Sequence, residues 1–485
     1  MVEPKHSFLL QLLLSLLVFL LTDTTTTTTG VQCFPHNKKL LSIHQFQSTH
    51  KTINNSTTCL SLSHKSRWEK GAAVLEMKNR DSCSEQITDW NNKLQKILIL
   101  DNLHVRSLQS RVKKINSGNN LDAQIPLVSG IRLETLNYIV TVELGGRNLT
   151  VIVDTGSDLT WVQCQPCKLC YNQKDPIFNP SISPSYQTIL CNSTTCQSLQ
   201  YATGNSGICG TNPPTCNYAV NYGDGSYTRG ELGKEKLNFG ANPVGNFIFG
   251  CGRNNRGLFG GASGLVGLGK SELSLVSQTS AIFGGVFSYC LPNTAADASG
   301  SLVLGGNSSV YRNSTPVSYT RMVPNPQLPT FYFLNLTSVS IGGVALQGPG
   351  TGQGGILIDS GTVITRLPPS LYRVLRREFL KQFSGYPSAP PFSILDTCFN
   401  LSGYQEVDIP TISMHFEGEA ELNVDVTGIF YFVKTDASQV CLALASLSFE
   451  DEIPILANYQ QRNQRVIYDT KASMLGFAAE ACSFN

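Results

Sequence analysis

The stretch VIVDTGSDLTWVQC, residues 151–164, decides the fold. An apolar run leads directly into Asp154, followed by small hydroxyl residues and a glycine, and Trp161 follows seven residues after the aspartate. A lone buried carboxylate costs free energy unless its charge is shared, neutralised by a proton or hydrogen-bonded. Either Asp154 opens an ordinary turn, or the fold places a partner beside it.

A second copy of this pattern lies 205 residues further along the chain, where residues 356–363 read ILIDSGTV. Each copy is followed by another apolar stretch, SGLVGLG at 263–269 and IPILANY at 453–459. One Asp-hydroxyl-Gly-hydroxyl loop alone is best explained as a turn with side-chain hydrogen bonds to its own backbone. Two matched copies instead predict a duplicated lobe.

Two similar lobes related by a pseudo-twofold axis bring equivalent loops together at their interface. Asp154 and Asp359 would then face each other and share one proton, because two adjacent carboxylates cannot both ionise freely. The charged member can take a proton from a water molecule that attacks a peptide carbonyl, while the neutral member hydrogen-bonds the carbonyl oxygen. The pair is therefore the predicted catalytic dyad, and this chemistry needs no metal and no organic cofactor.

The residues that flank the two aspartates have supporting roles in this prediction. A glycine permits a tight turn that brings backbone amides close to the carboxylates. One hydroxyl can hydrogen-bond across to the opposite loop, and the next can donate to the outer carboxylate oxygen, which favours ionisation. In these three roles the sequence offers Gly156 and Gly361, Thr155 and Ser360, and Ser157 and Thr362.

Residues 135–485 resemble the pepsin-like aspartic proteases (family A1). The resemblance implies a mainly β, bilobal fold with the active-site cleft between two related lobes. It also implies a β-hairpin flap over the substrate, which AVNYGDGSYTRGEL at 219–232 matches with Tyr222 as the flap tyrosine and Trp161 as its hydrogen-bonding support. Without the family, Tyr222 would be a plain hairpin residue and Trp161 a core residue.

Within that family the chain is similar to the atypical, nepenthesin-like plant branch. The similarity rests on a cysteine-rich insertion between Asp154 and Tyr222, on FGCG at 249–252 and on YQQRNQRVIYDT at 459–470. One residue departs from the pattern, because Ala457 stands where the first lobe has Gly267. Glycine permits close backbone packing behind the active-site loop, and an added methyl group is expected to cost about 1–3 kcal/mol if it crowds that space.

The cysteines and sequons favour an extracellular or secretory setting. Cys33, Cys59 and Cys83 precede residue 120, and the other twelve of the fifteen cysteines lie between Cys164 and Cys482. An even set in a secreted chain predicts disulfides, and zinc is the alternative for CQPCKLC at 164–170. A glycoprotein is expected from Asn-x-Ser/Thr sequons in the body. These begin at Asn148, Asn192, Asn307, Asn313, Asn335 and Asn400.

The N-terminus predicts a processed leader. The apolar run at 8–21 spans 14 residues, which suits a secretory signal better than a membrane helix, with an uncleaved anchor as the alternative. Residues 1–120 carry a net charge of +7 and the remainder −5. We therefore predict a signal peptide over 1–30, a basic pro-segment over 31–120, and lobes over 121–315 and 316–485. A solvated basic linker is the alternative to the pro-segment.

Secondary-structure signals agree with this division. The leader has poor strand periodicity and one predicted helix, around 93–114, whereas strand-like alternation begins at 135–144. One further helix is predicted after Ser370 as its cap, with Leu371 and Phe379 among the residues of its apolar face.

The sequence thus predicts a monomeric plant aspartic endopeptidase, made as a zymogen, that cleaves polypeptides at acid pH. It predicts no nucleic-acid partner and no membrane attachment after signal removal. Secretion to the apoplast is the expected route, with vacuole and plastid as alternatives. The rival function is a catalytically impaired protein that binds and inhibits glycosidases. A serine or cysteine hydrolase is disfavoured, because no G-x-S-x-G elbow is evident and paired cysteines leave no free thiol.

Overall fold

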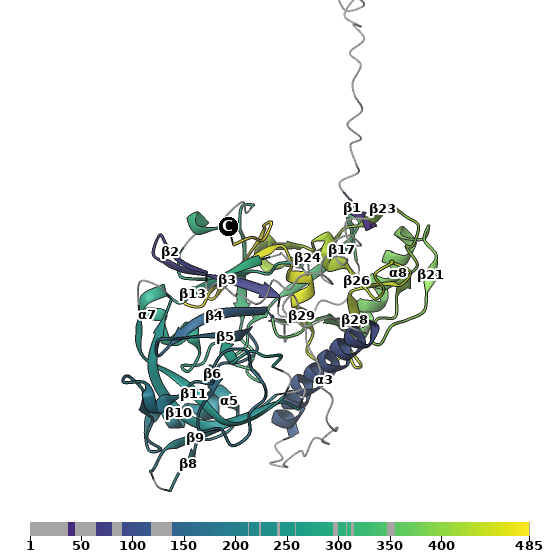
Figure 1. Ribbon diagram of the computed structural model, residues 1–485. Helices are drawn as coiled ribbons and strands as arrows, with labels where there is room; N and C mark the ends of the chain where they lie inside the picture. Colours follow the sequence, from purple (N-terminus) through teal and green to yellow (C-terminus); the bar gives the residue numbers. More distant parts are fainter. Residues whose placement is uncertain are drawn as a thin grey trace, which may run out of the picture. The chain divides into compact units, whose positions relative to one another are not determined.

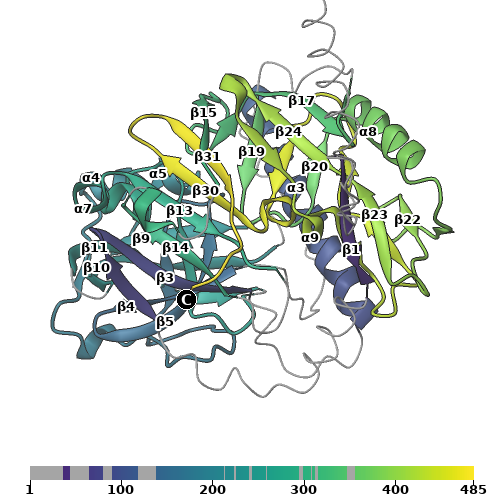
Figure 2. The ribbon, with the colours of Figure 1, turned by 90° about the horizontal axis from the view of Figure 1, so that it is seen from above.

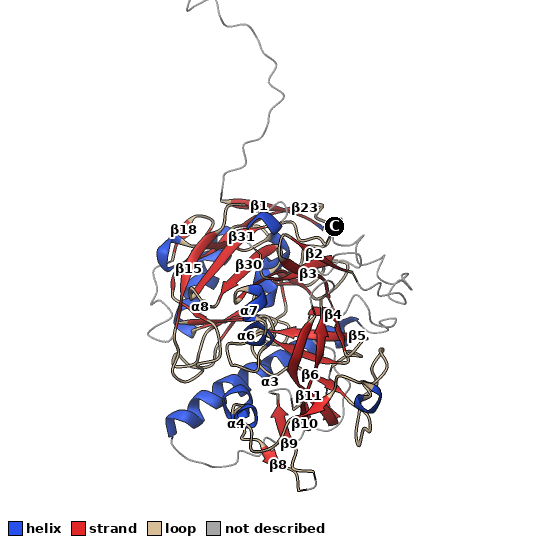
Figure 3. Ribbon diagram, turned by 90° about the vertical axis from the view of Figure 1, so that its left-hand side faces the viewer, coloured by secondary structure: helices blue, strands red, loops and turns tan. Residues whose placement is uncertain are grey.

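The computed structural model describes residues 37–43, 65–79, 90–117, 138–211, 213–222, 225–239, 243–257, 259–293, 299–306, 308–311, 315–346 and 355–484. The predicted signal peptide and the three leader cysteines lie outside these residues. From Lys38 onward the described residues belong to one unit in which strands predominate (Figures 1 and 3). The mainly β, bilobal fold that the sequence predicts is confirmed.

Residues 138–304 form the first lobe around strands that pair in a closed β arrangement. Its strands are β4 (Tyr138–Leu144), β5 (Arg147–Asp154), β6 (Trp161–Gln163), β7 (Gln187–Thr188), β8 (Ile208–Cys209), β9 (Cys216–Asn221), β10 (Tyr227–Asn238), β11 (Val244–Arg256), β12 (Gly264–Gly267), β13 (Val286–Cys290) and β14 (Ser299–Leu304). Its short helices are α4 (Thr194–Gln197), α5 (Leu199–Thr203), α6 (Leu275–Gln278) and α7 (Ser280–Phe283).

The second lobe repeats the same pairing around the second aspartate. Its strands are β15 (Ser318–Val323), β16 (Phe333–Leu334), β17 (Leu336–Ile341), β18 (Val344–Ala345), β19 (Ile356–Asp359), β20 (Thr365–Leu367), β21 (Ser388–Ala389), β22 (Cys398–Phe399), β23 (Glu406–Pro410), β24 (Ile412–Phe416), β25 (Glu421–Asn423), β26 (Phe430–Phe432), β27 (Val440–Leu442), β28 (Leu444–Ser446), β29 (Ile455–Ala457), β30 (Gln464–Asp469) and β31 (Met474–Ala479). Its helices are α8 (Pro369–Gln382) and α9 (Val426–Ile429).

A shared sheet joins the two lobes (Figure 2). Strand β13 of the first lobe pairs antiparallel with β30 of the second, and β30 continues to β31 and β15. Phe287 and Tyr468 stack at 4.4 Å between ring centres where β13 meets β30. The lobes are therefore tied together by backbone hydrogen bonds and by a continuous apolar core.

The leader contributes strands that the sequence did not predict. These are β1 (Lys38–Ser42), β2 (Ser66–Glu69) and β3 (Ala72–Asn79); β1 pairs with β23, while β3 lies between β14 and β4. The expectation of poor strand structure was wrong for β3 because both of its faces are mostly buried. Its first four residues, AAVL, are a continuous apolar run that lacks the alternation of a half-exposed strand, and alternation begins only at Leu75.

Both predicted helices are present. The leader helix α3 spans Trp90–Ser117. Helix α8 buries the predicted apolar face, but it begins at Pro369, one residue before the predicted cap. Proline suits the first helical position because its missing N–H has no intrahelical partner there. Ser370 instead donates its hydroxyl and its backbone N–H to Glu450 (2.9 and 2.7 Å).

All twelve cysteines of the body pair as disulfides, which confirms that expectation over zinc. A short loop bridge, Cys167–Cys170, closes within CQPCKLC, while the flanking Cys164 bonds Cys251 of β11. The remaining pairs are Cys191–Cys209, Cys196–Cys216, Cys290–Cys482 and Cys398–Cys441. The insertion after Asp154 is thus held to the first lobe by covalent bonds.

Candidate active site

The two aspartates end equivalent strands. β5 runs parallel to β12 and places Asp154 opposite Gly267, while β19 runs parallel to β29 and places Asp359 opposite Ala457. Both carrier strands are fully buried where they approach the aspartates, because apolar side chains line both of their faces. Each carboxyl group therefore emerges at the end of a rigid strand in the middle of the molecule.

The two loops face each other closely. A Cβ atom added to Gly156 would lie 2.8 Å from Asp359 Oδ1, and one added to Gly361 would lie 2.6 Å from Asp154 Oδ1. Each glycine also donates its backbone N–H to the aspartate of its own loop at 2.8 Å. Any larger residue at either glycine would collide with the opposite carboxylate. Glycine is therefore required here by space rather than by backbone angle.

The hydroxyl residues next to the aspartates link the loops across the interface. The backbone N–H of Ser360 donates to Thr155 Oγ1 (2.9 Å), and the backbone N–H of Thr155 donates to Ser360 Oγ (3.1 Å). The Thr155 hydroxyl donates to the Ser360 hydroxyl at 3.3 Å. These reciprocal bonds hold the two loops in register with each other.

The second pair of hydroxyls is not symmetric. Thr362 Oγ1 donates to Asp359 Oδ2 at 2.6 Å. Among the described residues, Ser157 Oγ is buried and has no hydrogen-bond partner, although its proximity to Asp154 opposes the rise in the pKa of that carboxyl group. Only Thr362 therefore makes the predicted bond in this state of the protein.

The two carboxyl groups have different proton affinities. Burial, reinforced by the charge of Asp359, raises the pKa of Asp154 to about 6. Burial acts in the same direction on Asp359, but the hydrogen bond and charge of His104, together with Thr362 and the Gly361 amide, outweigh it and lower its pKa. A proton on Asp154 beside a charged Asp359 is the arrangement that a general acid–base pair needs.

Ala457 fits the position where the first lobe has glycine. A Cβ atom on Gly267 would lie 2.3 Å from the backbone of Asp158, so no methyl group fits in the first lobe. In the second lobe Ala457 is fully buried, and its N–H donates to Thr365 Oγ1 at 3.0 Å, as the N–H of Gly267 donates to Thr160 Oγ1 at 3.3 Å. The second lobe keeps the same pairing despite the added methyl group.

The predicted flap contact is also present. Trp161 begins β6, is fully buried and donates its indole N–H to the Tyr222 hydroxyl at 2.7 Å. Tyr222 follows β9 in the hairpin with β10, and its backbone pairs with Ser226 and Gly225. Phe259 packs edge-on against both rings. Trp161 is therefore both a core residue and the hydrogen-bonding support of the flap tyrosine.

A histidine of the leader, which was not predicted from the sequence, also reaches the site. His104 lies on α3, and its Nε2 atom is 3.2 Å from Asp359 Oδ2. Burial opposes protonation of the ring, but the hydrogen bond and charge of Asp359, together with the negative charges of Asp154 and Asp101, raise the pKa of His104 to about 9. A positive imidazolium therefore contacts one member of the dyad. The basic charge of the leader was the only signal for such a contact.

The rest of α3 packs against the second lobe. Leu94, Ile97 and Leu98 join a buried apolar cluster with residues that include Val363 and Ile364, and Gln109 exchanges two hydrogen bonds with the backbone of Ile453 (both 2.8 Å). The helix lies beside β28 in Figure 1. It therefore covers the side of the second lobe from which the Asp359 carboxylate is reached.

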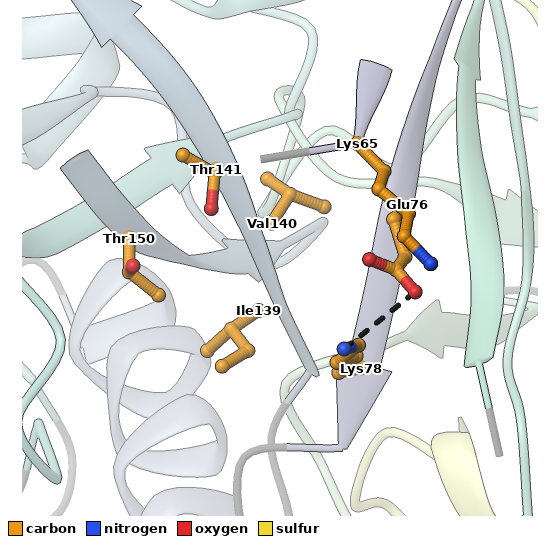
Figure 4. Close-up of a pocket in the computed structure, with 7 residues that line it drawn as sticks. All are labelled: Lys65, Glu76, Lys78, Ile139, Val140, Thr141 and Thr150. Carbon is orange, nitrogen blue, oxygen red and sulfur yellow. Dashed lines mark ion pairs between the residues drawn. The ribbon is translucent and has the colours of Figure 1, made fainter. Parts of the chain in front are cut away.

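Other chemical features of the described chain lie elsewhere. No group of three or more potential metal ligands occurs among the described residues. Within the same residues, no helix has the length and apolar character to cross a bilayer. Figure 4 shows a small surface pocket between β3 and the β4–β5 pair that contains neither aspartate. It is lined by Lys65, Glu76, Lys78, Ile139, Val140, Thr141 and Thr150.

Comparisons with known proteins agree with this geometry. The families described as Xylanase inhibitor N-terminal and Xylanase inhibitor C-terminal match residues 138–306 and 331–479. An aspartyl protease family protein of Arabidopsis thaliana is 44% identical over 397 residues, covering 80% of this chain and 82% of the relative. Aspartic proteinase nepenthesin-1 of Nepenthes gracilis is 35% identical over 389 residues, covering 78% and 84%.

Solved structures share the fold at low sequence identity. The crystal structure of edgp has a TM-score of 0.56 at 19% identity and covers 70% of this chain and 91% of that chain. Basic 7S globulin from soybean has a TM-score of 0.55 at 19% identity, covering 71% and 91%. The family matches and the relatives settle the classification: the chain belongs to the plant branch of the pepsin-like aspartic proteases, family A1, which includes the nepenthesins.

Proposed function

We propose that this chain is an aspartic endopeptidase, made as a zymogen, in which Asp154 and Asp359 together activate water for peptide-bond hydrolysis. The observation that carries the proposal is the reciprocal packing of the two loops, in which each glycine leaves room for the opposite carboxylate. Relatives named as aspartic proteases support the same reaction class.

Each carboxyl group has a separate role in the proposed reaction. Asp359, whose charge the Thr362 hydroxyl still stabilises after His104 has left, takes a proton from the water, and the water oxygen attacks the scissile carbonyl carbon. Asp154 donates its proton to the carbonyl oxygen as negative charge develops there. Collapse of the tetrahedral intermediate then breaks the C–N bond: the leaving amine receives the proton that Asp359 took from the water, and Asp154 regains its proton from a hydroxyl of the intermediate as the carboxyl product forms. The bonds between Thr155 and Ser360 keep the two groups at a fixed separation throughout.

The leader blocks this reaction in the proposed zymogen. His104 pairs with Asp359 and so removes the base, while the packed helix α3 occupies space that a polypeptide substrate would need. Leader strand β3 also pairs with strands of the central sheet. Activity therefore requires release of α3, whether or not β3 leaves with it.

The test is cleavage of an acid-denatured protein by the acid-treated chain between pH 2 and 7, with and without pepstatin. We expect acid-optimal cleavage that pepstatin and the substitution Asp154→Asn both abolish. A control substitution should lie away from the Asp154 loop, which excludes Asp158 because its backbone packs against that loop. Arg373→Gln, an exposed position on α8, serves instead. Absence of cleavage by a folded chain from which the leader has gone would overturn the proposal.

Inhibition of glycosidases is the second candidate, and it is favoured by the names of the two matching families, Xylanase inhibitor N-terminal and Xylanase inhibitor C-terminal. The retained dyad, both loop glycines and the bond between Trp161 and Tyr222 favour catalysis instead. A xylanase assay with the purified chain separates the two functions. Inhibition of xylanase without proteolysis would select the binding function.

We also propose that the protein follows the secretory route to the apoplast. Six disulfides in the body suit an oxidising compartment, and Asn148 and Asn192 are exposed sequon positions. Recovery of a glycosylated chain from apoplastic fluid is the expected result. Recovery from vacuoles or plastids would contradict it.

A further inference from the structure

A carboxylate of the leader lies in a site built by the second lobe, four to seven residues beyond Asp359. Asp101 Oδ1 accepts the backbone N–H of Val363 at 2.6 Å, and Oδ2 accepts the N–H of Ile364 at 3.3 Å. Arg366 donates to Oδ2 from Nη2 at 2.7 Å. Three donors from one short segment thus converge on one carboxylate.

The site is buried and already holds its cation in place. The Arg366 side chain is 2% exposed and the Asp101 side chain is fully buried. A second hydrogen bond, from Arg366 Nη1 to the carbonyl oxygen of Ile364 (2.9 Å), fixes the guanidinium without using Asp101. Burial disfavours the charged guanidinium and lowers its pKa, whereas the carboxylate of Asp101 opposes that effect. The buried cation therefore needs an anionic partner.

The internal duplication places Arg366 at the position that Trp161 occupies in the first lobe. Arg366 follows Asp359 by seven residues, as Trp161 follows Asp154 by seven. Both residues take the same place in their sheets: Trp161 pairs with Leu265 of β12, and Arg366 with Ile455 of β29. Trp161 donates to the flap tyrosine, whereas Arg366 donates to a segment that must leave for the enzyme to act.

We propose that the site vacated by Asp101 binds an acidic side chain of the polypeptide substrate, so that the released enzyme prefers an aspartate at one position near the cut bond. This inference rests on the proposed protease function. Val363 and Ile364 amides and the Arg366 guanidinium supply the donors that Asp101 uses in the zymogen. The leader thus occupies a substrate site with a substrate-like carboxylate.

The leader helix gives the distance of that position from the dyad. Asp101 and His104 lie three residues apart on one helix face, so their side chains begin about 5–6 Å from each other. His104 contacts Asp359 while Asp101 occupies the Arg366 site. An extended peptide rises about 3.3 Å per residue and repeats its facing side chains every two residues. The preferred acidic residue should therefore lie about two residues from the scissile bond.

The test compares matched octapeptides in which one residue, moved through each position, is Asp or Asn. For the acid-released enzyme at about pH 5, kcat/KM should favour Asp over Asn by at least about tenfold at one position about two residues from the cut, as a charge-assisted hydrogen bond allows. Comparing kcat/KM for octapeptides with a free and with an amidated C-terminus shows whether the enzyme recognises a side-chain carboxylate or the terminal one. Preference for the free terminus alone would overturn the proposal.

Substitution and pH give two further readouts of the same ratio. Arg366→Gln should reduce the Asp/Asn ratio to about one, whereas Arg373→Gln on the exposed face of α8 should leave it unchanged. If Arg366→Gln does not fold, the pH dependence of the Asp/Asn ratio for the wild type tests the site. That ratio should fall toward one at about pH 2.5, because the substrate carboxylate is then protonated. A ratio near one at every position for the folded wild type would refute the site.

Binding separates this inference from the proposed function. A leader-free Asp154→Asn chain should bind a fluorescein-labelled Asp octapeptide about tenfold more tightly than its Asn counterpart, measured by anisotropy at about pH 5. Tighter binding without cleavage by the wild type would support the carboxylate site and refute the protease. Cleavage of both peptides at equal kcat/KM, with equal binding, would refute the carboxylate site and support the protease.

Discussion

Replacing His104 with glutamine should open the zymogen without removing any catalytic group. The pKa of the ring rises from 6.5 to about 9 in the docked leader. Each pKa unit corresponds to about 1.4 kcal/mol, so the protonated ring favours docking by about 3 kcal/mol. The His104 side chain is 24% exposed, which makes this an upper value. Glutamine should therefore increase the open fraction by up to about 100-fold.

The direction of the pH effect follows from the same values. A raised histidine pKa stabilises docking fully below pH 6.5, where the free leader would also be protonated, and this stabilisation is lost as the pH rises through about 9. The lowered pKa of Asp359 stabilises docking above about 3.8, and that contribution is lost as the pH falls through the lowered value. At about pH 5 both contributions are present, so the loss of docking free energy caused by His104→Gln should be largest there.

The assay is the initial rate at which the unprocessed chain cleaves a quenched fluorescent peptide at about pH 5, with gels to verify that the leader is intact. His104→Gln should show a rate up to about 100-fold above wild type. Arg106→Gln, an exposed position on the same helix, should match wild type. Equal rates for wild type and His104→Gln, with measurable activity after full processing of both, would refute the role given to the ion pair.

Four other results are expected. Leader release followed on gels should begin only below about pH 3.8, because the pKa of Asp359 is lowered; half-release near pH 6.5 would contradict this. Thr155→Val should destabilise the fold by about 1–3 kcal/mol in urea titrations, since a buried backbone N–H loses its acceptor; an unchanged midpoint would be contrary evidence. Gly267→Ala should lower the melting temperature, whereas Ala457→Gly should cost no more than about 1 kcal/mol; equal losses would argue against the crowding described for the first lobe. Trp161→Phe should lower kcat/KM for peptides because the bond to the flap is lost, with the fold intact by circular dichroism; full activity would show that this bond does not support the flap.

The features that could be predicted from sequence are those that repeat within it. Asp154 and Asp359 lie on matched apolar strands, so a duplicated lobe and facing carboxylates follow from the pattern and from the pseudo-twofold arrangement. The bond between Trp161 and Tyr222 required the family resemblance, because spacing alone is equally consistent with a core tryptophan. Disulfide pairing could not be assigned from spacing, although the preference for disulfides over zinc could.

The leader was the least predictable part. The first half of strand β3 lacks alternation because both of its faces are buried there, and a burial pattern of that kind depends on neighbours far away in the sequence. His104 and Asp101 lie on a helix whose charge pattern looks like that of an ordinary solvated face. Their roles emerge only when the helix meets Asp359 and Arg366, more than 250 residues later. Such contacts carry no local sequence signal.

Single and double substitutions at the dyad test most directly whether the two carboxyl groups act together. Asp154→Asn, Asp359→Asn and the double variant should be processed in trans, verified as folded and assayed for peptide cleavage. If the two carboxyl groups act as one unit, each single substitution should abolish nearly all activity and the double variant should lose no more than either. Losses that multiply in the double variant, or substantial activity in either single variant, would contradict the shared-proton dyad.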